Sequence, residues 1–175
     1  DGQATFANWT GYTKGINGLI YDVKDATRTP VAADFTFTNT GKDGNGSIPV
    51  APVAFATQAT ADPTVTRCIF TFEGVIDCWL QVTIGTGFGL EAPETHWWGN
   101  ARGDTGAGNS GTNILVNAND EVMCRAPYLH NAFNPAPVDD ASDLNKDRLV
   151  NANDEVLCRS PYVTNAFNCV KAIVR

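Results

Sequence analysis

Oxygen-bearing side chains recur at regular intervals near the carboxyl end of the chain. The segment DLNKDRLVNAND places Asp or Asn at its first, third, fifth, ninth and twelfth positions: Asp143, Asn145, Asp147, Asn151 and Asp154. Calcium is a hard cation that takes six to eight oxygen ligands, and a twelve-residue loop supplies them from these positions, with a backbone carbonyl at the seventh. Leu149 occupies that seventh position. The spacing therefore predicts a calcium-binding loop over residues 143–154.

An earlier segment of the chain repeats this one. VNANDEVMCRAPYLHNAFN (116–134) and VNANDEVLCRSPYVTNAFN (150–168) agree at 15 of 19 positions, with an offset of 34. Aligned on the shared Asn and Asp residues, the earlier loop contains fewer carboxylates, and its third position is Gly111, which has no side-chain oxygen. The ligands expected there are Asn109, Asn113, the carbonyl of Leu115, Asn117 and Asp120, with Asp104 just upstream as a further candidate. We therefore expect two calcium sites, of which the second loop matches the pattern better.

A simpler interpretation is that these Asn and Asp residues form Asx-turns and cap two helices. Capping explains each residue singly, but it does not explain why the same order of oxygens recurs. A helix is expected after each loop; in the second copy Asn151 is a suitable N-cap and Pro161 would end the helix. Arg148 occupies the sixth position, where such loops place Gly for a sharp turn. Because Lys146 and Arg148 also reduce the local negative charge, we expect a dissociation constant of about 10⁻⁴–10⁻³ M.

The first half of the chain has the texture of β-structure. Runs rich in Val, Ile, Thr and aromatic residues predict strands within residues 15–23, 31–40, 64–72 and 77–85, separated by Gly/Asn/Asp loops. Several short strands at regular spacing predict an antiparallel β-sandwich. From about residue 99 polar loops alternate with short helical pieces. The expected chain is thus mainly β with a small α part, with a β-domain over 1–98 and a duplicated calcium-binding module over 99–175.

The five cysteines suggest disulfides. Cys68 and Cys78 flank a short loop in the predicted hairpin RCIFTFEGVIDCW, and pairing across it would bring their Cα atoms to about 5.5 Å, the disulfide distance; two buried thiols are the alternative. Cys124 and Cys158 occupy equivalent repeat positions and would bridge if a pseudo-twofold axis brings them together. Cys169 is then left to pair with another chain, or with Cys158, or to join a zinc site.

Charge and composition exclude several classes of protein. The net charge of −7 argues against binding nucleic acid or anionic lipid, both of which need a basic surface. No apolar run approaches the roughly 20 residues that span a bilayer. Bridged cysteines and a first residue other than Met favour a processed chain in an oxidising, extracellular setting. No G-x-S-x-G elbow or nucleophile–base set is present, and the acids Glu73, Asp77, Glu91 and Glu94 are interpreted as solvated loop residues, so no enzymatic activity is expected.

A duplicated loop–helix segment that lacks the entering helix of an EF-hand resembles a dockerin. The whole chain is similar to C-terminal regions of large secreted bacterial proteins, through YTKGINGLIYDV (12–23), WLQVTI (79–84) and THWWGNARGDTGAGN (95–109). The resemblance implies calcium at both loops and a secreted or cell-surface setting. Cellulosomal dockerins often have Ser-Thr at the tenth and eleventh loop positions, where this chain has Ala118-Asn119 and Ala152-Asn153, so binding to a cohesin is not expected.

These features lead to two hypotheses of function. The first is a secreted or cell-surface calcium-binding structural module that contacts another protein, including copies of itself in an extracellular polymer. The second is a calcium-stabilised carbohydrate-binding module that stacks a glycan on Trp97 and Trp98 of the HWW segment. Exposed indole rings would favour the second hypothesis, and buried rings would count against it.

Overall fold

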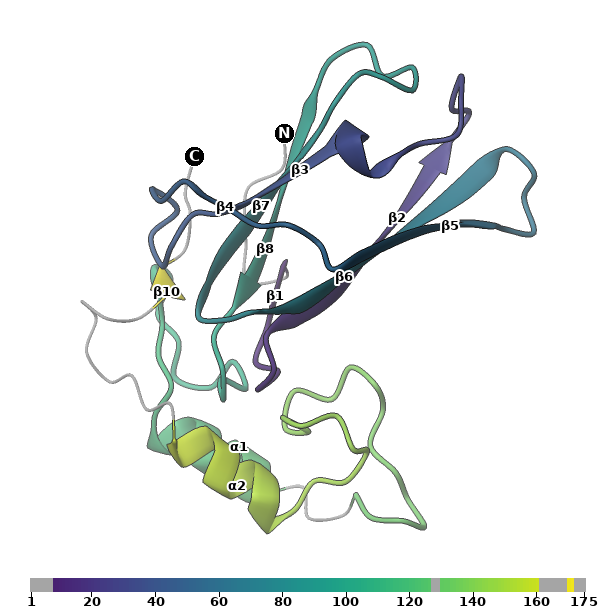
Figure 1. Ribbon diagram of the computed structural model, residues 1–175. Coiled ribbons are helices and arrows are strands. Elements are labelled where there is room, and N and C mark those ends of the chain that lie inside the picture. Colours follow the sequence, from purple (N-terminus) through teal and green to yellow (C-terminus); the bar gives the residue numbers. More distant parts are fainter. Residues whose placement is uncertain (1–7, 127–129, 161–169, 172–175) are drawn as a thin grey trace.

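The computed structural model describes residues 8–126, 130–160 and 170–171. Strands make up most of its regular structure, and the α-helices are α1 (Ala118–Arg125) and α2 (Ala152–Arg159). Figure 1 shows the strands above the two helices, which lie side by side. The prediction of a mainly β chain with a small α part is therefore confirmed.

The larger sheet has five strands in the order β1-β8-β7-β3-β4. Their bounds are Trp9–Thr10 for β1, Glu94–Asn100 for β8, Cys78–Ile84 for β7, Phe35–Asn39 for β3 and Ile48–Pro49 for β4. Neighbouring strands are antiparallel except β1 and β8, which run parallel. The central strands consist largely of β-branched and aromatic residues, which pack well on a pleated surface.

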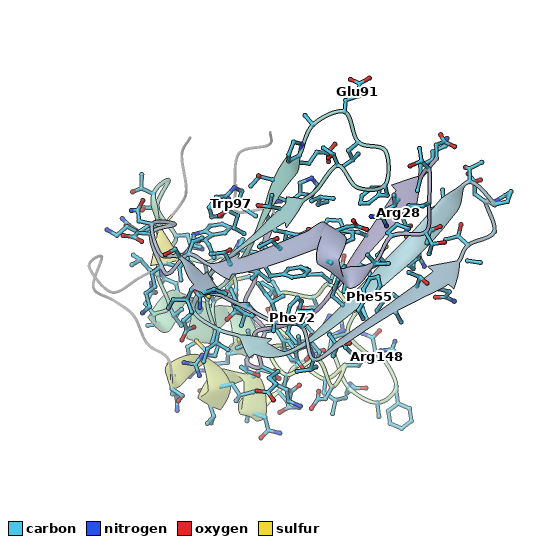
Figure 2. All side chains as sticks on the ribbon, turned by 45° about the horizontal axis from the view of Figure 1, so that its top comes forward. Arg28, Phe55, Phe72, Glu91, Trp97 and Arg148 are labelled. Atoms are coloured by element: carbon cyan, nitrogen blue, oxygen red, sulfur yellow. The ribbon has the colours of Figure 1, made fainter. Side chains whose placement is uncertain are left out.

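The smaller sheet has three antiparallel strands in the order β2-β6-β5: Ile16–Lys24, Val65–Val75 and Ala54–Ala59. Both sheets contribute inward-facing side chains to one apolar core. Its members include Leu19 and Tyr21 from β2, Phe70 and Phe72 from β6, Phe35 and Phe37 from β3, and Leu80 and Val82 from β7. The rings of Phe37 and Phe70, from different sheets, lie 4.8 Å apart. Figure 2 shows Phe72 and Phe55 among these packed side chains.

The predicted hairpin between Cys68 and Cys78 is wrong. β6 and β7 are consecutive, but they belong to different sheets: Cys68 pairs with Tyr21 and Thr57, whereas Cys78 pairs with Asn100. The short connection between them carries the chain from one sheet to the other. Cys68 and Cys78 are accordingly buried free thiols and form no bridge. Alternating apolar residues on both sides of a short loop do not reveal whether the chain returns within one sheet or crosses to another.

The second half of the chain is joined to the larger sheet. β9 (Asn113–Ile114) pairs with β10 (Val170–Lys171), and the Trp79 indole nitrogen donates to the Lys171 carbonyl at 2.6 Å. Ile114 and Val170 are buried in a second apolar cluster with Trp79 and Trp97. The predicted domain boundary between residues 98 and 99 falls inside β8. No helix in the described ranges has the length and apolar character needed to cross a membrane.

Candidate metal centre

The second loop (143–154) places two carboxylates in the interior of the protein. Asp143 and Asp154 are 1% and 0% exposed. One oxygen of Asp154 accepts the Leu144 N–H at 2.9 Å and the other accepts the Asn151 N–H at 3.1 Å, which fixes the start of α2. One oxygen of Asp143 accepts the Arg148 N–H at 2.9 Å. The other oxygen, Oδ1, is buried and has no hydrogen-bond partner among the described residues.

The remaining predicted ligands of the second loop form a series of Asx-turns. Oδ1 of Asp147 accepts the Leu149 N–H at 2.9 Å, Oδ1 of Asn145 accepts the Asp147 N–H at 2.9 Å, and Oδ1 of Asn151 accepts the Asn153 N–H at 2.8 Å. The chain closes this compact loop with two residues at positive φ, Lys146 at 58° and Arg148 at 70°. The conformation expected at the sixth position is therefore confirmed, and it is held by a residue type that adopts it at some cost.

Two acids of the second loop act electrostatically on a third, Asp154. Burial raises the pKa of Asp154 above its ordinary value, and the neighbouring carboxylates of Asp143 and Asp147 raise it further. The N–H groups of Asn151 and Leu144 act in the opposite direction. The loop thus concentrates negative charge in a region from which water is largely excluded, which favours either protonation or a bound cation.

The first loop has the same framework but begins earlier than its sequence alignment indicates. Thr105 donates its N–H and its hydroxyl to Oδ1 of Asp120, both at 2.9 Å, as Leu144 donates to Asp154. Oδ1 of Asn109 accepts the Leu115 N–H at 2.7 Å, as Asp147 accepts that of Leu149. Asp104 is therefore the equivalent of Asp143, and Asn109 is the equivalent of Asp147. The alignment that starts this loop at Asn109 is corrected accordingly.

The ungapped alignment failed because the first loop is longer. Asp104 and Asp120 are 16 positions apart, against 11 for Asp143 and Asp154. The extra residues form a turn at Ser110 that leads into β9, and the Asn113 side-chain amide donates to the hydroxyls of Ser110 and Thr112. Asn113 thus lies on β9, where it pairs with Lys171 and bonds to this turn. Asn117, predicted as a calcium ligand, is the N-cap of α1.

Asp104 and Asp120 form a buried carboxyl pair. They are 2% and 0% exposed. Burial, together with the hydrogen bond and charge of Asp120, raises the pKa of Asp104 to about 8. The Asn109 amide and the Gly106 N–H lower it in part. At neutral pH this pair therefore holds a proton unless a cation takes its place.

The charge of these four buried carboxylates is not neutralised by basic residues. Within the described ranges no salt bridge joins any of them to Arg, Lys or His. The arginines of α1 and α2, Arg125 and Arg159, pair instead with Glu121 and Glu155 at 2.5–2.7 Å. Removing an uncompensated carboxylate from water costs several kcal/mol. The arrangement is therefore poor for an empty protein and suitable for a bound cation.

His, Cys, Asp and Glu side chains alone do not form a metal cluster. Among the described residues no three of them converge closely enough to hold an ion. A cation in either loop would therefore need Asn side chains and backbone carbonyls as well, which is the ligand type that calcium accepts and zinc does not favour.

The strand entry into the β region contacts both loops. The N–H and the hydroxyl of Thr13 donate to the Leu144 carbonyl, at 3.0 and 3.1 Å. A Cβ at Gly11 would lie 1.9 Å from the Asp104 carbonyl oxygen, so only glycine fits there. A cleft of about 400 Å³ is lined by Gly11 and Tyr12 on one side and by Asp104 and Asp143 on the other. The residues after β1 thus lie against both loops at their first positions.

Cys124 and Cys158 are also free thiols, so the second predicted bridge is not formed. Both are buried in one cluster between α1 and α2, where burial raises the pKa of Cys158 to about 12 and also raises the pKa of Cys124. The two equivalent cysteines of the repeat therefore do lie in one cluster, where they pack as buried side chains and form no disulfide. Cys169, and with it the proposed interchain pairing or zinc site, lies outside the described residues.

The tryptophans of the HWW segment do not form an exposed platform. Trp97 is 6% exposed and packs against Trp79 and Ile114. Trp98 is half-buried, contacts the main core and donates its indole N–H to the Tyr21 hydroxyl at 2.8 Å. Trp97 is therefore not available to stack on a sugar, and Trp98 is only partly exposed.

Comparison of the chain with models of known families, with curated proteins and with solved structures finds no match. The resemblance to dockerins therefore rests on the residues of the two loops and the quoted motifs alone.

Proposed function

We propose that this chain is a calcium-stabilised structural and protein-interaction module that acts outside the cell. The observation that carries the proposal is the burial of two equivalent carboxyl pairs without basic partners. Within them, Oδ1 of Asp143 is a buried acceptor without a hydrogen bond. A buried unsatisfied carboxylate oxygen is costly, and a hard cation is the ligand that removes the cost.

The two loops supply different ligand sets. In the second loop calcium would be held by Asp143, Asn145, Asp147, Asn151, Asp154 and the carbonyl of Leu149. In the first loop the set shifts to Asp104, Asn109 and Asp120, with Asn117 and the carbonyl of Leu115. The ion would supply positive charge to the buried carboxylates, which no salt bridge among the described residues provides. Because the second loop has one more carboxylate, we assign it the tighter site.

Calcium would also strengthen the attachment of the helices to the β region. The Leu144 peptide donates its N–H to Asp154 and accepts two hydrogen bonds from Thr13 through its carbonyl. An ion that fixes Asp154 therefore fixes the peptide on which the β region rests. We regard the two sheets as the layers of a mostly antiparallel β-sandwich, and the paired loops and helices as a dockerin-like unit clamped to it.

The partner and the setting follow from different observations. We assign a protein partner, including a second copy of this chain. The buried Trp97 gives no support to the carbohydrate hypothesis, which we do not carry forward. The extracellular setting rests on the calcium loops and the resemblance. The described cysteines no longer support it, because they are free thiols.

Calorimetric titration of the chelator-treated protein with calcium tests the proposal. We expect two sites with dissociation constants of about 10⁻⁴–10⁻³ M. Calcium at 100 times the dissociation constant should stabilise the fold by about 2.7 kcal/mol. Asp143→Asn should lose the tighter site. The matched control Glu91→Gln removes a charge at the far end of the β region, away from Arg148 (Figure 2), and should bind like the original chain. No heat and no shift in melting temperature would refute the proposal.

A further inference from the structure

One edge of the smaller sheet lies open. β5 pairs with β6 on one side, and no strand pairs with its other side in the described part of the chain. Phe55 points inward and its ring lies 4.9 Å from that of Phe70, whereas the other residues of the strand are exposed. In Figure 1 β5 lies well away from α1 and α2. Its outer backbone N–H and C=O groups are therefore free to pair with another strand.

This edge lacks the features that protect strand edges from pairing. Proteins usually place charges, Pro or bulges on such strands. The opposite edge of the same sheet, β2, has two of these protective features. It contains the charged residues Asp22 and Lys24, and its pairing with β6 is irregular between Ile16 and Gly18. β5 contains no charge and no Pro, and its register with β6 is regular throughout. Residues 44–61 hold no Asp, Glu, Lys or Arg, in a chain of net charge −7.

An apolar groove adjoins the beginning of β5. It has a volume of about 340 Å³ and is lined mainly by Val50, Val53, Phe72, Val75 and Ile76, with Glu73 as its charged member. Val53 is 58% exposed and Ile76 is 43% exposed. Large apolar side chains that surround an open strand edge gain free energy when a neighbouring strand covers them.

We propose that the β5 edge pairs antiparallel with the β5 edge of a second copy of this chain. A strand edge is complementary to itself in antiparallel pairing, because donors and acceptors alternate along it. If the twofold axis passes beside residue 56, Ala56 of one copy lies opposite Ala56 of the other and Val53 lies opposite Ala59, within the uncharged segment. Elsewhere the acidic surfaces of two copies repel each other. The inference specifies the self-contact in the proposed function and does not depend on calcium binding.

Sedimentation velocity over a range of concentrations, with and without calcium, tests this pairing. The original chain should form dimers that weaken as it is diluted. Ala56→Lys places a charge on the outer face of β5 and should weaken the dimer by roughly tenfold or more, because like charges then face each other. Ala33→Lys adds the same charge at an exposed site on the approach to β3 and should leave the dimer unchanged. Circular dichroism should show the same fold in all three proteins.

A charge-exchange experiment locates the contact directly. Ala56→Glu alone should also weaken the dimer, and an equimolar mixture of Ala56→Lys and Ala56→Glu should restore it as a mixed dimer. A monomeric original chain, or dimerisation unaffected by Ala56→Lys, would overturn the inference. A monomer that nevertheless binds a peptide of residues 52–61 would show an edge reserved for a strand of another protein, and would overturn the assignment to a second copy. Calorimetry on Ala56→Lys reports calcium binding separately, so either idea can fail alone.

Discussion

The two loops share their ends and differ in their middles. Each begins with a buried Asp and ends with a buried Asp that caps a helix, Asp104 with Asp120 and Asp143 with Asp154. The second loop is compact, and its polar side chains bond to its own backbone. The extra residues of the first loop form a turn that leads into β9, where Ile114 is 1% exposed in one cluster with Trp79 and Trp97. A duplicated loop can therefore keep its terminal carboxylates while its middle becomes an apolar anchor.

This difference has an electrostatic consequence. The first loop contains a carboxyl pair in which Asp104 has a pKa of about 8, and the amide of Asn109 stands where the second loop has the carboxylate of Asp147. Without a cation, the first loop reduces its charge by holding a proton. The second loop has one more acid, so its charge is harder to reduce in this way. The first loop should therefore depend more on pH, and the second more on calcium.

The largest expected effect is a loss of stability as pH rises in the absence of calcium. The folded-state pKa of Asp104 is raised above its unfolded value of 3.8. The stabilisation of the folded state by protonated Asp104 is thus fully present below about pH 4. It is lost as pH rises towards 8, and the free energy of unfolding falls by up to about 1.4 kcal/mol per pH unit. Urea unfolding of the chelator-treated protein at pH 5, 6, 7 and 8 measures this slope.

Two variants separate the loops in that experiment. Asp104→Asn keeps the size of the side chain and removes the proton equilibrium, so it should flatten most of the slope. Saturating calcium should also flatten it, because the ion replaces the proton. Glu91→Gln should reproduce the original slope. A slope that survives Asp104→Asn would assign the titration to Asp154, whose pKa burial also raises, and would reverse the contrast between the loops.

The apolar anchor of the first loop is the next largest expected effect. Ile114→Ala should cost about 2–5 kcal/mol of unfolding free energy, because it leaves a cavity in the buried cluster that contains Trp79 and Trp97. The cost should be the same in calcium and in chelator, since Ile114 holds no cation. Urea unfolding in both conditions measures it. Val122→Ala on α1, where the side chain is 55% exposed, is the control and should cost little. A much smaller cost in chelator would mean that the anchor forms only after calcium binds.

The sequence predicted the features that depend on neighbouring residues and missed those that depend on distant ones. Strong β-runs predicted β2, β3, β6 and β7, and the repeated segment predicted a helix after each loop with Asn151 as N-cap of the second, because these signals are local. The pairing of β6 with β2 instead of β7 depends on contacts far apart in sequence, which no local pattern contains. The insertion in the first loop was hidden because an ungapped alignment places Asn109 opposite Asp143. The GDTG segment (103–106) marks the true start of the first loop. Asp104 and Thr105 there occupy the positions of Asp143 and Leu144 in the second loop.

The hydrogen bond from Thr13 gives a smaller effect that is specific to the second loop. Thr13→Val keeps the shape of the side chain and removes the hydroxyl donor to the Leu144 carbonyl, worth about 1 kcal/mol. Because the same peptide donates to Asp154, we expect calcium affinity to fall by up to about fivefold at the tighter site only. Calorimetry measures both sites. Thr36→Val, at an exposed position on β3, is the control. Equal loss at both sites would indicate a general loosening of the β region.

The smallest expected effect comes from Arg148, which holds φ at 70° in the second loop. Arg148→Gly frees the backbone and removes a positive charge from the loop, so the calcium affinity should rise by at most about threefold. Stability without calcium should change by under about 1 kcal/mol, because the relief of strain is offset by the larger entropy of the unfolded chain. Arg148→Gln separates the two causes, since it removes the charge and keeps the strained backbone. If both variants bind calcium alike, charge limits the affinity of this loop. If only glycine improves binding, the limit is the conformation that Arg148 is forced to adopt.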